Sequence, residues 1–138
     1  IKITNRQEAF RRHPVAGTLA WHNHSQTFHV DAAAIEYGHI LRRQKTLRSL
    51  AVYIALQVLT FVKKLARPAG EQDVNALFGD GTPIKRREIR NVLNAFWKNL
   101  SAFRWQTGDI LLIDNFAVSH GRLPYKGPRE ILVTWTNY

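Results

Sequence analysis

Two residue types, cysteine and methionine, are missing from this sequence altogether. Without cysteine the chain has no disulfide framework and no thiolate metal site. Such a composition is typical of proteins in a reducing compartment, so we expect a cytoplasmic location. A signal-peptide pattern is also missing, and the first residue is Ile1 instead of methionine. We therefore expect the sequence to start in the interior of a longer chain.

Acidic residues are scarce, because 10 Asp and Glu stand against 20 Lys and Arg, which gives a formal net charge of +10. Such a charge attracts phosphate backbones without reading base sequence. No zinc-finger, basic-zipper or RNA-recognition motif accompanies it, so we expect solvated helix ends and no specific nucleic-acid partner. A basic module that binds nucleic acid or a membrane surface stays an alternative. The basic clusters lie at 11–12, 42–45, 63–64 and 85–87.

No apolar run is long enough for a comfortable membrane span. The most apolar segment is 47–65, but only residues 49–62, which is 14 positions, separate Arg48 from Lys63. A spanning helix needs roughly 20 apolar residues. We therefore expect a buried helix and no transmembrane segment, with a basic-flanked helix on a membrane surface as the alternative.

The composition is otherwise that of a globular protein, with 45% hydrophobic and 22% charged residues. A chain of 138 residues forms at most one ordinary domain with a real core. Aromatic and β-branched residues predict a strand over 21–30, and the Ala-, Ile- and Leu-rich stretch that follows predicts a helix over 32–43.

A turn at 79–81 is predicted from its two glycines, and a helix is predicted to follow it. Thr82 is the expected N-cap and Pro83 the first helical residue. Two apolar strands, 109–119 and 130–136, are predicted to close the chain. The core-facing residues of the predicted helix, at helical spacing, are Ile89, Val92, Leu93, Phe96, Trp97 and Leu100.

His120 is the first candidate for chemistry, because it directly follows the apolar strand predicted at 109–119. Neutral imidazole is a good ligand for divalent iron. The alternative is a core histidine that is hydrogen-bonded to a backbone carbonyl.

Arg129 is the second candidate, since it lies between Pro128 and the apolar run that begins at Ile131. A guanidinium facing a core needs an anion, and its planar fork matches a carboxylate. An internal partner, either Asp109 or Asp114, is the alternative to a bound carboxylate. His120 and Arg129 are nine positions apart, so they could face one cavity.

Three blocks of the sequence carry a family resemblance. The C-terminal block comprises 108–115, His120-Gly121-Arg122 and Gly127-Pro128-Arg129. The upstream blocks are 12–17 with 21–23, and 78–84. Taken in their order along the chain, the three blocks resemble the taurine dioxygenase-like (TauD/TfdA) family of iron(II)- and 2-oxoglutarate-dependent oxygenases.

The resemblance implies a mainly β fold with helical insertions, a double-stranded β-helix (a cupin-like jelly roll) that is incomplete in this chain. Residues 1–138 would be the C-terminal part of a single oxygenase domain, with a helical insertion at about 32–104. Carried over from the family, His120 is the distal iron ligand and Arg129 binds the far carboxylate of 2-oxoglutarate. Arg122 would line the entrance of the same 2-oxoglutarate site, and Asn23 is a predicted substrate-pocket residue.

The family's remaining iron ligands form a His-x-Asp/Glu pair, and His29-Val30-Asp31 has this spelling. In the family, however, the pair precedes the block that matches 12–17, whereas here it follows. We therefore keep His29 and Asp31 only as alternative ligands and expect the true pair N-terminal to this chain.

The resemblance implies a 2-oxoglutarate-dependent dioxygenase that uses iron(II), 2-oxoglutarate and O2. The expected reaction is hydroxylation of an amino acid or related small molecule, free or tethered to a carrier protein, with decarboxylation of 2-oxoglutarate to succinate. Halogenation or desaturation stays open, because the remaining ligands decide between them. A homo-oligomer is also expected. A non-catalytic jelly-roll binding protein is the alternative from another class.

Overall fold

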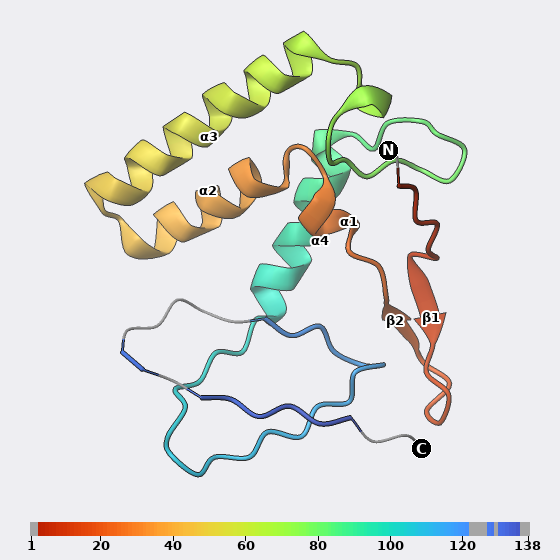
Figure 1. Ribbon diagram of the computed structural model, residues 1–138, viewed down its shortest axis with the longest axis vertical. Helices are drawn as coiled ribbons and strands as arrows, with labels where there is room; N and C mark the ends of the chain where they lie inside the picture. The colour runs from red at the N-terminus through yellow and green to blue at the C-terminus, as the bar shows by residue number, and fades with distance from the viewer. Residues whose placement is uncertain (1–2, 122–126, 129, 136–138) are drawn as a thin grey trace.

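The computed structural model describes residues 3–121, 127–128 and 130–135. In this part of the chain two short strands precede four helices (Figure 1). Helices α2 and α3 lie side by side, and α4 runs across the end of this pair near α1. The elements are β1 (Phe10–Arg12), β2 (Leu19–Trp21), α1 (Ser25–Phe28), α2 (Ala32–Gln44), α3 (Leu47–Ala66), a 3-10 turn (Ala69–Glu71) and α4 (Arg86–Asn99).

Strands β1 and β2 form an antiparallel hairpin in which Phe10 pairs with Trp21. The turn closes through a hydrogen bond from His13 N to Thr18 O (2.8 Å), and Gly17 adopts a φ of 68° that favours glycine. The rings of Phe10 and Trp21 meet edge to face at 5.4 Å, and Trp21 contacts Phe96 of α4 at 6.5 Å. These aromatic contacts attach the hairpin to the helices.

The link between α2 and α3 is only two residues long, which makes the helices antiparallel neighbours. Lys45 takes a left-handed φ of 51° at the end of α2. Thr46 then caps α3, because its Oγ1 accepts a hydrogen bond from Ser49 N at 3.1 Å. The helix predicted over 32–43 is confirmed.

The buried apolar core is small and lies between α2 and α4. Ile35 of α2 packs with Ile89 and Leu93 of α4, and Ile84 covers them from the preceding loop. The predicted core-facing stripe of α4 is thus confirmed at its first turns, while Leu100 is exposed.

Helix α3 was predicted to be buried, and this prediction is wrong. Its buried residues, Ser49 and Thr60, are polar. Gln57 belongs to the same side, where its Nε2 donates to Ala34 O of α2 at 3.1 Å. The opposite side is apolar and exposed, at Leu47, Leu50, Ile54, Val58, Leu59, Phe61, Val62 and Leu65.

With 20 residues and a mean hydropathy of 1.5, α3 is long and apolar enough to cross a membrane by length and composition alone. This is a weak indication, since core helices of soluble proteins share these properties. That the chain has no transmembrane segment therefore stays a prediction.

Two local predictions are corrected by the structure. The strand expected over 21–30 ends at Trp21, and α1 begins four residues later. Thr82 is not an N-cap, since its backbone and hydroxyl both donate to Asp80 Oδ1 within the turn (2.9 and 2.7 Å). Pro83 bridges to Leu77 instead of opening a helix, so α4 starts at Arg86. The predicted turn itself is confirmed, with Gly81 N donating to Phe78 O at 2.9 Å.

The mainly β fold is not confirmed by the described residues, whose regular elements are mostly helices, with two short strands. Neither 109–119 nor the described part of 130–136 forms a strand. Ile110 and Leu112 are 96% and 92% exposed. A strand needs a partner for its backbone hydrogen bonds, and the described part of the chain places none beside these segments. Figure 1 shows residues 101–121 as a long loop.

Candidate functional site

Two of the sequence blocks that carry the family resemblance meet in space through His13 and Asp114, which lie 101 positions apart. His13 Nε2 and Asp114 Oδ2 are 2.7 Å from each other, and the His13 ring contacts the Phe116 ring at 6.0 Å. His13 is 7% exposed at the start of the β1–β2 turn. The contact therefore attaches the C-terminal segment to the hairpin.

The hydrogen bonds of His13 define which ring nitrogen carries the proton. Its Nδ1 accepts from the backbone N–H groups of Val15 and Ala16, at 3.1 and 2.9 Å. Since an accepting nitrogen carries no proton, the neutral ring has its hydrogen on Nε2 and donates it to Asp114. The turn residues thus orient the ring toward the carboxylate.

Asp114 is stabilised as a carboxylate. The hydrogen bond from His13 lowers the pKa of Asp114 below its ordinary value of 3.8, and the backbone N–H of Phe116 adds to this effect. Phe116 N donates to Asp114 Oδ1 at 3.0 Å. Asp114 was a candidate partner for Arg129, and its partner in the described part of the chain is His13. No signal in the sequence alone had linked these two residues.

His120 is exposed and lies six residues beyond Asp114. It forms no hydrogen bond or ion pair with another described residue, so its imidazole is available as a ligand. Arg122 and Arg129 lie outside the described residues. The convergence of His120 with these arginines therefore stays a prediction.

His29 and Asp31, the alternative iron ligands, are engaged in a buried polar cluster. Asp31 has no exposure, and its two oxygens accept from Lys64 Nζ at 2.6 Å and Arg86 Nη1 at 2.7 Å. His29 Nε2 contacts Ile84 O at 2.9 Å, while its Nδ1 accepts from Asp31 N. These contacts occupy both His29 nitrogens and both carboxylate oxygens, which favours a structural role over metal binding.

Asn23 orients the start of α1. Its Oδ1 accepts hydrogen bonds from the backbone N and the hydroxyl of Ser25, at 3.0 and 2.7 Å. The side chain is only partly buried. Its role as a substrate-pocket residue stays a prediction.

A complete iron site does not form among the residues that the structure describes, since no three His, Asp or Glu side chains cluster there. Asp114 is bound to His13, and Asp31 to two cations. Of the predicted ligands in the described residues, His120 alone has no partner, whereas the 2-His-1-carboxylate face needs three donors. The described residues alone therefore do not supply the full set of ligands for an iron(II) ion.

Comparison with known proteins assigns the chain to a family. The model of the taurine catabolism dioxygenase TauD, TfdA family matches residues 2–135. This match covers nearly the whole sequence, including the blocks around His13 and Asp114. The chain belongs to this family of dioxygenases.

Two relatives are similar to parts of the chain. The dapdiamide synthesis protein DdaC of Enterobacter agglomerans is 30% identical over 133 residues, which is 96% of this chain and 34% of that protein. A clavaminate synthase-like protein of Arabidopsis thaliana is 42% identical over 57 residues, 41% of this chain and 17% of that protein. The chain therefore spans about a third or less of their lengths. No solved structure matches it significantly.

Proposed function

We propose that the chain is the co-substrate-binding part of an iron(II)- and 2-oxoglutarate-dependent oxygenase. The family match over residues 2–135 carries this proposal, because it includes both His120 and Arg129. The proposed reaction is hydroxylation of an amino acid or related small molecule. The name of DdaC, a dapdiamide synthesis protein, supports a small-molecule substrate. We propose that this substrate is either free or carried by a protein.

The proposed roles follow from the chemistry of each side chain. Arg129 binds the far carboxylate of 2-oxoglutarate through its planar fork, and Arg122 lines the same mouth. His120 supplies one neutral nitrogen to iron(II), and the bound metal would supply activation of O2. The remaining ligands are expected outside the described residues. The contact of His13 with Asp114 holds the segment that bears His120.

Binding of 2-oxoglutarate tests the proposal directly. Under anaerobic conditions with iron(II), calorimetry should show that Arg129→Ala weakens 2-oxoglutarate binding at least about tenfold, since a charge-assisted bidentate contact is lost. Arg104→Ala is the matched control, because Arg104 is an exposed arginine of the C-terminal segment. Unaltered affinity in Arg129→Ala would remove the central assignment.

Turnover tests the role of His120. His120→Ala should abolish iron-dependent release of succinate from 2-oxoglutarate, and normal release would contradict the assignment. A second candidate function is that of a non-catalytic binding protein. It is favoured by the lack of a three-ligand cluster among the described residues. Anaerobic titration that shows no iron uptake by the protein would favour this second function.

A further inference from the structure

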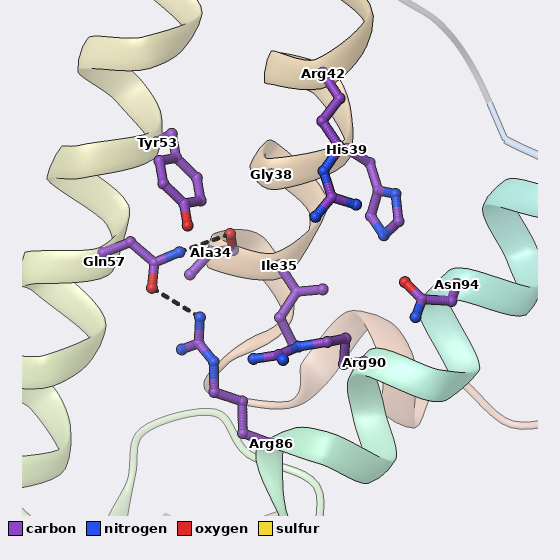
Figure 2. A pocket seen from close by; sticks show the side chains of 10 residues that line it. All are labelled: Ala34, Ile35, Gly38, His39, Arg42, Tyr53, Gln57, Arg86, Arg90 and Asn94. Atoms are coloured by element: carbon purple, nitrogen blue, oxygen red, sulfur yellow. Dashed lines mark hydrogen bonds between the residues drawn. The ribbon is translucent and has the colours of Figure 1, made fainter.

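A cavity of about 230 Å3 is lined by residues of α2, α3 and α4 (Figure 2). Its floor is apolar at Ala34 and Ile35. Most of its remaining wall is polar or positively charged. The lining residues are Ala34, Ile35, Gly38, His39, Arg42, Tyr53, Gln57, Arg86, Arg90 and Asn94.

Positive charge in this cavity is only partly neutralised. Three arginines line it, and no Asp or Glu does. Arg86 is engaged, because its Nη1 donates to Asp31 Oδ1 and its Nη2 donates to Gln57 Oε1, both at 2.7 Å. Arg42 and Arg90 make no hydrogen bond or ion pair with any residue in the described ranges. Figure 2 shows both side chains extending from their helices toward the space between them.

The rest of the wall is held in place by packing. The His39 ring stacks on Trp97 at 5.2 Å, and the Arg43 guanidinium lies 4.8 Å from the centre of the Trp97 ring. Gly38 brings α2 close to Tyr53, since a Cβ at this position would lie 3.4 Å from the Tyr53 ring. Burial, followed by the charge of Arg42, lowers the pKa of His39 below 6.5.

We propose that this cavity binds a small oxyanion, a carboxylate or phosphate group, on the guanidinium groups of Arg42 and Arg90. Guanidinium groups bind both kinds of oxyanion with paired, charge-assisted hydrogen bonds. Tyr53 and Asn94 are neutral donors in the same wall. The volume is below the range of about 300–1,000 Å3 typical of drug-sized ligands, so the ligand is small. His120 does not line this cavity, and the proposal does not depend on the proposed oxygenase activity.

Titration calorimetry on the whole chain tests the proposal with two probes, inorganic phosphate and succinate, at constant ionic strength. At least one probe should bind in the millimolar range or tighter. Arg42→Gln and Arg90→Gln should each weaken that binding roughly tenfold, because each removes a charge-assisted contact. Neither arginine contacts a described residue through a hydrogen bond or ion pair, so both variants should keep the helical circular dichroism spectrum.

Arg48→Gln is the matched control, since Arg48 is an exposed arginine of α3 that does not line the cavity. Its binding should equal that of the unmodified protein. Selective binding of phosphate or of succinate would identify the preferred oxyanion within the proposal. Equal weakening in Arg48→Gln would show a general charge effect and overturn the site, as would the failure of both probes to bind.

Discussion

Asp31 has no exposure, and its carboxylate contacts two cationic partners. Lys64 and Arg86 come from α3 and from the start of α4, so one carboxylate joins both to the N-terminus of α2. Asp31→Ala leaves two cations without their partner. Because both are partly exposed, we expect a loss of about 2–4 kcal/mol in the free energy of unfolding, measured by urea denaturation.

The control for Asp31 is the exposed ion pair of Arg67 and Asp73, in which Nη1 and Oδ1 are 2.5 Å apart. Surface ion pairs contribute little, so Asp73→Ala should cost less than about 1 kcal/mol. Equal losses in both variants would show that the Asp31 cluster is no stronger than a surface pair.

Asp114 gives a prediction with a defined dependence on pH. Its pKa in the folded protein is below the ordinary value, chiefly because of the hydrogen bond from His13. A lowered folded-state pKa means that the contact adds stability above the unfolded pKa and that this stability is lost as the pH falls through the folded pKa. His13→Phe should therefore move the Asp114 titration midpoint, followed by the carboxyl NMR shift, upward toward 3.8. An unchanged midpoint would contradict the contact.

Single residues show how far sequence reasoning reaches at this scale. His13 and Asp114 both lie in blocks that carry the family resemblance, yet nothing in a linear pattern indicates that residues 101 positions apart meet. The spelling His29-Val30-Asp31 suggested metal ligands, and the described contacts are instead a carbonyl and two cations. The order of the blocks also argued against these two residues as ligands, and the location of the His-x-Asp/Glu pair stays a prediction.

Among the elements, α3 depends on its first turn. Thr46 Oγ1 accepts from Ser49 N, and Ser49 Oγ in turn donates to Thr46 O at 2.8 Å. Thr46→Ala removes the cap and should cost about 1 kcal/mol in the free energy of unfolding, measured by thermal or urea denaturation. Thr46→Ser keeps the hydroxyl and should cost much less, so equal losses would exclude capping as the cause.

The exposed apolar side of α3 predicts self-association. Large exposed apolar patches favour contacts between molecules. Replacing Ile54 and Val58, which are 52% and 57% exposed, by Gln should reduce association in analytical ultracentrifugation. The free energy of unfolding should change by less than about 1 kcal/mol, because exposed positions contribute little. A large loss of stability would mean that this side is buried in the folded protein.

Helices were easier to predict than their orientation or their first residues. Apolar content and length identified α2, α3 and α4, because these properties act locally. The side of α3 that turns inward depends on polar partners such as Ala34 O, which belong to another element. The start of α4 moved past Thr82 because Asp80, only two residues away, competes for its hydrogen bonds.

At the scale of the whole molecule, the helices and the C-terminal segment differ in how well their backbone N–H groups are protected from hydrogen exchange. The backbone N–H groups of 110–113 form no hydrogen bond with a described residue, whereas those of α2 are bonded within the helix. Hydrogen exchange should therefore be close to the unprotected rate at 110–113 and slowed many-fold in α2. Strong protection at 110–113 would mean that this segment pairs as a strand.

The apolar pattern of 109–119 predicted a strand for sound local reasons, but a sheet is a property of several segments together. Alternating or continuous apolar residues indicate a strand only where neighbouring strands complete the hydrogen bonds. Family membership implies a jelly roll, and the regular elements of the described residues are mostly helices. The family was therefore predictable from short blocks, while the sheet was not.

The bond between His13 and Asp114 also sets a limit on distance. His120 lies six positions after Asp114, and a fully extended chain covers at most about 3.6 Å per residue, or roughly 20 Å in total. While this bond is intact, the imidazole of His120 stays within about that radius of the hairpin turn, plus the length of its side chain. Any metal site that includes His120 must therefore lie inside this sphere, whichever segments contribute the other ligands.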